Sequence, residues 1–208
     1  MPKKKSKNLL LIFTRNPELG KAKTRLAKTV GDYTALEIYK FLLERTKTIS
    51  SEVKIADKAV YYSVKIREHD IWDASIFQKH QQIGEDLGIR MKNAFKNGFD
   101  AGYQKVMIIG SDLYDLSSKN IEKAFEELDT NDVVIGPAED GGYYLLGMNT
   151  LQENVFKNKD WGTETVRKDT LNDLIDKKVK LLEIKNDIDV YEDIIQIPEI
   201  MQTFINSK

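Results

Sequence analysis

The sequence predicts an α/β protein of three layers (α/β/α), in which helices cover both faces of a mainly parallel β-sheet. Short apolar runs rich in β-branched and aromatic residues alternate with longer segments of helical periodicity along nearly the whole chain. Strand–helix–strand connections are right-handed and bring successive strands parallel to one another, so the helices come to lie on the faces of the sheet. The chain of 208 residues has the length of one such domain. We therefore expect residues 1–208 to form a single domain that begins with a flexible basic tail at residues 1–7.

Seven apolar runs are candidate strands, and five helical patterns separate or follow them. The expected strands are residues 8–14, 58–64, 76–82, 105–111, 132–137, 143–148 and 179–184. The expected helices are residues 33–49, 87–99, 120–128, 163–178 and 190–205. Ser117 or Ser118 is placed to cap the third helix and Thr163 the fourth, because hydroxyl oxygens accept hydrogen bonds from the free N–H groups of a first turn.

The composition argues against several classes of protein. The 32 basic and 33 acidic residues leave a net charge of −1, and the basic residues are scattered, so a nucleic-acid partner is not expected. The absence of cysteine excludes disulfides and thiolate metal sites. The apolar run 9–13 is too short for a signal peptide, and no run reaches the ~20 apolar residues of a membrane span. We expect a soluble, cytoplasmic protein without a membrane partner.

A basic, glycine-bearing stretch, TRNPELGKAKTRLA, follows the first expected strand. In sheets of this kind ligands bind beyond the carboxyl ends of the strands. Arg15, Lys23 and Arg25, with the free backbone around Gly20, suit a pyrophosphate or triphosphate. Neither GxxxxGK[ST] nor GxGxxG is present, so the stretch is not a P-loop and does not indicate an NAD site. A solvated basic loop is an equally good interpretation.

Two further strand ends carry acids. Asp112 and Asp115 follow the run 105–111, and Asp187 and Asp189 follow the last run. Hard divalent cations prefer carboxylate oxygens, and one or two carboxylates plus substrate phosphates suffice for Mg²⁺. Turn formation and helix capping explain some of these acids equally well.

The stretch GPAEDGGYY, between the runs 132–137 and 143–148, places two adjacent acids beside two glycines. Adjacent carboxylates repel each other, so a plain hairpin turn does not require both Glu139 and Asp140. Glycine allows the backbone to approach a ligand closely. The stretch is compatible with a turn that carries a site.

Three weaker signals concern substrate contacts. Gly84, just before the helix expected at 87–99, could let a base or ribose approach the backbone, although a simple turn predicts the same sequence. Tyr143 continues a strand and is more often a packing residue than a substrate contact. Trp161, in DWGTET, either stacks on a sugar or base or anchors the core.

Taken in order, the stretches FTRNPELGKAKTRLA, QQIGEDLGIRM, GSDLYDLS, GPAEDGGYYLLGM, WGTET and DIDVYED resemble those of GT-A-fold nucleotide-diphospho-sugar transferases. More narrowly, they resemble the small bacterial glycosyltransferases associated with radical-SAM or selenodomain proteins and with arsenosugar biosynthesis. The resemblance runs from about residue 12 to residue 193. Two departures, Leu113-Tyr114 and Trp161-Gly162-Thr163, concern the acceptor pocket more than the nucleotide site.

The resemblance implies that Arg15, Lys23 and Arg25 neutralise the diphosphate of a nucleotide-sugar donor. It implies that Asp112, with Asp189 as second ligand, holds Mg²⁺ or Mn²⁺. Gly20 and Gly84 belong to the same nucleotide site.

On the acceptor side, the resemblance implies that Asp140, with Glu139 beside it, acts as a base or orients the substrate. Gly141 and Gly142 would let the backbone pass close to the sugar or phosphate, and Tyr143 and Trp161 are expected to contact substrate. The implied function is metal-dependent transfer of a sugar to a small-molecule acceptor. Nucleotidyl transfer from an NTP to a phosphorylated or cofactor acceptor is the alternative, and a non-catalytic nucleotide-sugar binding protein is a third.

Overall fold

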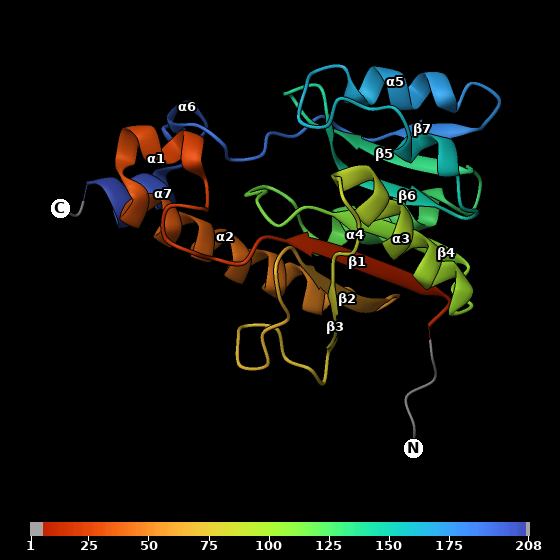
Figure 1. The fold of residues 1–208 in the computed structure, drawn as a ribbon, viewed down its shortest axis with the longest axis horizontal. Helices are drawn as coiled ribbons and strands as arrows, with labels where there is room; N and C mark the ends of the chain where they lie inside the picture. The colour runs from red at the N-terminus through yellow and green to blue at the C-terminus, as the bar shows by residue number, and fades with distance from the viewer. Residues whose placement is uncertain (1–5, 207–208) are drawn as a thin grey trace.

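The computed structural model describes residues 6–206, and most of the expected basic tail lies outside that range. One seven-stranded sheet runs through the described residues, in the order β3-β2-β1-β4-β6-β5-β7 (Figure 1). The strands are β1 (Asn8–Thr14), β2 (Asp57–Tyr62), β3 (Phe77–Gln81), β4 (Lys105–Ile109), β5 (Val133–Pro137), β6 (Tyr143–Met148) and β7 (Val179–Leu181). Each lies within one residue of, or inside, one of the seven apolar runs, so the expected strands are confirmed.

The sheet is mainly parallel, as predicted. β6 is the exception, because it runs antiparallel to both of its neighbours, β4 and β5. All other neighbouring strands are parallel. The antiparallel strand follows from the short turn at 138–142, which returns the chain directly beside β5 and leaves no room for a helical crossover.

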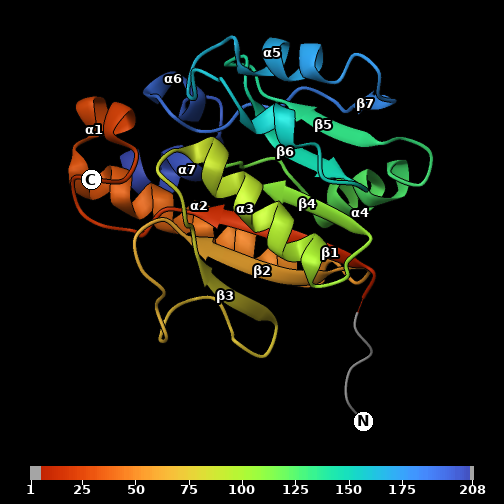
Figure 2. The ribbon, with the colours of Figure 1, turned by 45° about the vertical axis from the view of Figure 1, so that its right-hand side comes forward.

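Helices cover both faces of the sheet, which confirms the three layers. They are α1 (Thr24–Val30), α2 (Asp32–Glu52), α3 (Leu87–Asp100), α4 (Ser118–Glu127), η1 (Glu153–Phe156), α5 (Val166–Asp173), α6 (Tyr191–Ile194), α7 (Pro198–Ile200) and η2 (Met201–Ile205). Successive side chains of β1 point to opposite faces of the sheet. Leu10 packs with α2 and α4 on one face, and Leu11 packs with α3, η1 and α5 on the other. Figure 2 shows α2 and α3 on opposite sides of β1 and β2.

The helices differ from expectation at three places. The basic stretch after β1 was expected to be a loop, but it becomes a helix, α1, from Thr24 onward. The pattern 190–205 is divided into α6, α7 and η2, because Pro198 has no backbone N–H to continue a helix begun before it. The pattern 163–178 forms helix only over 166–173, and Thr163 does not cap it, since its hydroxyl donates to the carbonyl of Asp160.

The cap expected for the third helix is confirmed. The Ser117 hydroxyl oxygen accepts a hydrogen bond from the Asn120 backbone N–H, and the Asn120 side chain accepts one from the Ser117 N–H. Within residues 6–206, none of the helices combines the length and the apolar composition needed to cross a bilayer.

Candidate functional site

Two adjoining cavities open at the carboxyl ends of β1 and β4. The larger, which we call the basic cavity, has a volume of about 710 Å³ and is lined by Arg15, Lys21, Lys23, Arg25 and Arg90, among others. The smaller, the acidic cavity, has a volume of about 220 Å³ and is lined by Asp112, Asp140, Asp187 and apolar side chains. Phe13, Leu87, Gly110 and Asp112 line both, so the two form one cleft.

The basic stretch after β1 is tied to the body of the protein by two buried polar side chains. The Tyr39 hydroxyl accepts a hydrogen bond from the Arg15 N–H at 2.9 Å and donates one to the Arg15 carbonyl at 3.1 Å. The Asn16 amide donates to the carbonyl of Lys65 and accepts from the N–H of Val64. The start of this stretch is therefore a fixed wall of the cleft rather than a solvated loop.

Lys23 lies at the centre of the cleft. Its ammonium is 2.7 Å from a carboxylate oxygen of Asp112 and 3.5 Å from one of Asp189, and its side chain is only 6% exposed. Burial alone would lower the pKa of the Lys23 ammonium, but the attraction of Asp112 and Asp189 outweighs it and raises the pKa. The backbone of Lys23 has φ of +49°, a conformation that costs a non-glycine residue about 1 kcal/mol. The buried, charged lysine thus joins two of the strand-end acids despite local strain.

Arg25 and Asp189 form an exposed ion pair, with 2.7 Å between a guanidinium nitrogen and a carboxylate oxygen. The backbone N–H of Asp189 donates to the carboxylate of Asp193, which fixes this end of the segment. Asp189 lines the basic cavity and not the acidic one. Arg90 also lines the basic cavity and was missed by the sequence analysis, although it lies in the stretch QQIGEDLGIRM.

Two glycines assigned to the nucleotide site do not line the cleft. Gly20 has φ of +72°, and the nearest atom to an added Cβ is a carboxylate oxygen of Asp32. Gly84 has φ of +143°, and a Cβ there would lie 2.6 Å from the Ile89 side chain and 2.9 Å from the Arg90 nitrogen. Both positions therefore have a conformational reason for glycine, and Gly84 also allows the chain to pass close to the first turn of α3.

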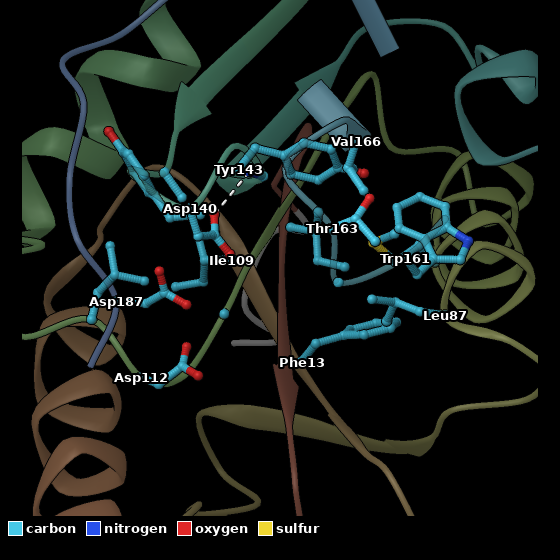
Figure 3. Close-up of a pocket in the computed structure, with 18 residues that line it drawn as sticks. Phe13, Leu87, Ile109, Asp112, Asp140, Tyr143, Trp161, Thr163, Val166 and Asp187 are labelled. Carbon is cyan, nitrogen blue, oxygen red and sulfur yellow. Dashed lines mark hydrogen bonds between the residues drawn. The ribbon is translucent and has the colours of Figure 1, made fainter. Parts of the chain in front are cut away.

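Asp112, Asp140 and Asp187 lie near one another on one side of the acidic cavity (Figure 3). Asp112 comes from the end of β4 and Asp187 from the segment beside it, because the Ile188 N–H donates to the Asp112 carbonyl at 3.2 Å. Burial, then the nearby carboxylates of Asp112 and Asp140, raise the pKa of Asp187 to about 6. Asp189 was the predicted second metal ligand and Asp187 only a neighbouring acid, since spacing along the chain does not reveal which of the two faces Asp112.

The turn between β5 and β6 separates its two acids. The Asp140 carboxylate accepts a hydrogen bond from the Gly142 N–H at 2.8 Å and lines the acidic cavity. Glu139 instead lines a separate hollow with Tyr114 and Asp115. The structure therefore does not bring Glu139 together with Asp140, because successive side chains of this turn point to different sides.

The two glycines of the turn have different neighbours. Gly141 has φ of +89°, and a Cβ there would lie 2.3 Å from the carbonyl oxygen of Glu164. The space beside Gly141 is thus occupied by the chain's own backbone, whereas Gly142 lines the acidic cavity. The N–H of Arg167 donates to the Gly141 carbonyl, which ties the turn to the start of α5.

Tyr143 and Trp161 combine the packing and lining roles that the sequence left open. Both line the acidic cavity, and both pack against the core on the α3 side of the sheet. The Tyr143 hydroxyl is buried and has no hydrogen-bond partner among the described residues. The indole of Trp161 lies where a Cβ on Gly88 would be 2.6 Å away, so Gly88 makes room for it.

The carboxylates near the cleft offer a divalent cation only part of a coordination shell. In the described part of the chain no three His, Cys, Asp or Glu side chains are grouped to hold a metal ion. Asp112 and Asp187 share a cavity, while Asp112 and Asp189 share the Lys23 ammonium. This donor set fits Mg²⁺ or Mn²⁺ only where substrate phosphates complete the shell.

Comparison with solved structures places the fold among nucleotide-handling transferases. A protein from Desulfovibrio desulfuricans G20, provisionally named a nucleotide-diphospho-sugar transferase, is 30% identical to this chain and superposes with a TM-score of 0.80. The match covers 96% of this chain and 92% of the D. desulfuricans protein. The 4-diphosphocytidyl-2C-methyl-D-erythritol synthase of Anaerococcus prevotii DSM 20548 is 15% identical and superposes with a TM-score of 0.59; the match covers 95% of this chain and 96% of the synthase. A cytidylyltransferase from Leptospira borgpetersenii is 13% identical and superposes with a TM-score of 0.58; the match covers 96% of this chain and 88% of the cytidylyltransferase.

The last two similarities show the fold alone. A search of curated protein sequences gives no match. The sequence profile of the family described as "Uncharacterized protein conserved in bacteria (DUF2064)" matches residues 48–163, more than half of the chain. The chain belongs to this DUF2064 family.

Proposed function

We propose that the protein transfers a sugar from a nucleotide-diphospho-sugar, whose diphosphate lies in the basic cavity, to a small acceptor in the acidic cavity. The observation that carries the proposal is the sharing of Asp112 by the two cavities, one lined by cations and the other by carboxylates. A donor needs positive charge beside the leaving diphosphate, and in an inverting transfer the acceptor hydroxyl needs a base on the other side of the reacting carbon. The similarity to the D. desulfuricans protein supports a nucleotide donor.

In the proposed reaction the bond between the anomeric carbon and the diphosphate oxygen breaks, and a bond to the acceptor oxygen forms. Lys23 stabilises the negative charge of the leaving diphosphate, since it is buried, charged and held in place by Asp112. Asp140 accepts the proton of the acceptor hydroxyl, and the hydrogen bond from the Gly142 N–H holds its carboxylate toward the cavity.

Mg²⁺ or Mn²⁺ would be held by Asp112, with Asp187 or Asp189 and the phosphates of the donor, and would supply further positive charge to the leaving group. The association with arsenosugar biosynthesis rests on the resemblance alone and is a further part of the proposal, which an acceptor assay addresses.

A thermal-shift panel tests the donor. UDP-, GDP-, ADP- and dTDP-sugars are compared with the free NTPs, each with and without Mn²⁺, because a ligand that binds only the folded chain raises its melting temperature. Stabilisation by one nucleotide-sugar supports sugar transfer. Stabilisation by CTP or GTP alone would instead favour nucleotidyl transfer, the second candidate, which the fold of the Leptospira cytidylyltransferase supports.

Two variants test the roles of the acids. Asp112→Asn is expected to abolish metal-dependent turnover while the fold is retained. Asp140→Asn, which keeps the oxygen that accepts from Gly142, is expected to reduce transfer and leave donor binding intact. Full activity of Asp112→Asn, or loss of donor binding in Asp140→Asn, would contradict these assignments. A protein that binds the donor and shows no turnover with any acceptor would be the non-catalytic binding protein.

A further inference from the structure

We propose that the part of the acceptor that enters the acidic cavity is uncharged or cationic, carries an apolar or ring face, and bears no phosphate. The inference rests on the proposed function and narrows the class of its acceptor. It follows from the charges and the walls of the acidic cavity.

The ionised side chains of the acidic cavity are all carboxylates. Asp112, Asp140 and Asp187 line it, and no lysine, arginine or histidine does so within residues 6–206. Asp112 is paired with Lys23, but in the described chain Asp140 and Asp187 form no ion pair. An anionic acceptor would be desolvated against these carboxylates without a compensating cation, which is costly.

The adjoining basic cavity has the opposite charge. Arg15, Lys21, Lys23, Arg25 and Arg90 line it, and its acids are Glu18, Asp112 and Asp189. The cleft thus separates a region that suits phosphate from one that repels it. A divalent cation bound at Asp112 would offset part of the negative charge, but Asp140 would still face the acceptor.

The wall opposite the acids is apolar. In Figure 3 Phe13, Leu87, Trp161 and Val166 lie across the cavity from Asp112 and Asp187. Rings and apolar side chains on one side and carboxylates on the other suit an amphiphilic molecule, with its ring or hydrocarbon face on Trp161 and its hydroxyl or amine toward the acids. The volume of about 220 Å³ restricts the enclosed part to a small molecule or one end of a larger one.

The charge pattern also bears on the class of reaction. An enzyme that moves a nucleoside monophosphate onto a phosphorylated acceptor must bring that phosphate to the donor. Among the described residues, the only charged side chains on the acceptor side of this cleft are carboxylates. A hydroxyl acceptor is accommodated, and a phosphate acceptor is disfavoured.

A matched set of probes on one phenyl scaffold tests the proposal. We would titrate 2-phenylethanol, the cationic 2-amino-2-phenylethanol, the anionic mandelate and 2-phenylethyl phosphate into the full chain at low ionic strength. Quenching of tryptophan fluorescence reports occupancy, because the chain has two tryptophans and one of them, Trp161, lines the cavity. The Trp161→Phe variant leaves only Trp72, which is buried in the opposite core cluster, and identifies the Trp161 signal.

The neutral and cationic probes should bind, with dissociation constants at least about tenfold below those of mandelate and the phosphate. The Asp140→Asn variant keeps the turn hydrogen bond and removes one negative charge. The dissociation constant of an anionic probe divided by that of the cationic probe should therefore fall by about threefold or more. Asp115→Asn, the same chemical change in the neighbouring hollow, should leave the ratio unchanged.

Binding of the phosphate probe as tightly as the neutral one would overturn the proposal. So would the absence of binding by both the neutral and the cationic probe at concentrations up to about 10 mM, the range expected of fragment-sized ligands. The nucleotide panel is a separate readout on the basic cavity. Failure of every nucleotide to bind would refute sugar transfer and leave the probe result standing, so the two failures are distinguishable.

Discussion

Substitution of Gly141 by alanine should destabilise the protein substantially. The residue has φ of +89°, which costs alanine about 1 kcal/mol relative to glycine. A Cβ would also lie 2.3 Å from the Glu164 carbonyl oxygen and 2.5 Å from its Cα. These are backbone atoms that cannot rotate away, and overpacking of this kind costs about 1–3 kcal/mol. We expect the free energy of unfolding of Gly141→Ala to fall by about 3 kcal/mol in total.

Gly162→Ala is the matched control. Gly162 has nearly the same φ, +86°, but no heavy atom lies within 4 Å of the position of its Cβ. The free energy of unfolding of Gly162→Ala should therefore fall only by the backbone conformational cost, about 1 kcal/mol. In a chain of this size each kcal/mol shifts the melting temperature by about 2–4 °C, so calorimetry should separate the variants by about 4–8 °C.

Equal melting temperatures for Gly141→Ala and Gly162→Ala would show that the contact with Glu164 carries no energy, which contradicts the expected difference. The Gly141→Ala variant should also perturb Trp161 fluorescence, because the segment displaced by the clash includes a wall of the acidic cavity.

Three further predictions concern charge and capping. The raised pKa of Asp187 means that the folded protein binds this proton more tightly than the unfolded chain does, so stability falls as pH rises from about 4 to about 6. Without divalent cations, the free energy of unfolding of Asp187→Asn, measured with urea, should exceed that of the wild type by about 2 kcal/mol at about pH 7.5 and should equal it near pH 4. The free energy of unfolding of Ser117→Ala should fall by about 1 kcal/mol because the capping box is lost, and that of the control, Ser118→Ala, should fall by only a few tenths of a kcal/mol in the same assay. Asp70→Ala removes the partner of the largely buried Lys79 ammonium and should cost about 3 kcal/mol, whereas an unchanged urea midpoint would show that this ion pair adds no stability.

Much of the architecture was predictable because it depends on local patterns. The seven apolar runs predicted seven strands, since buried strands must be apolar whichever strands lie beside them. Ser117 predicted a helix start because a hydroxyl satisfies N–H groups only a few residues away. Where a competing local effect was overlooked the prediction was wrong, as at Pro198, which divides the apolar-periodic segment 190–205.

Periodicity and strand polarity are local properties of the chain, so the order of the residues is enough to predict the layers of the fold and the strand ends at which charged residues gather. Which of those charges meet depends on how the chain folds. Lys23 and Asp112 are 89 residues apart in sequence and 2.7 Å apart in space. Asp187 faces Asp112 and Asp140 while Asp189 turns to Lys23 and Arg25, and Glu139 points away from its neighbour Asp140. Contacts of this kind depend on the order of the strands and the direction of each side chain at its strand end, and neither is encoded by residue spacing alone.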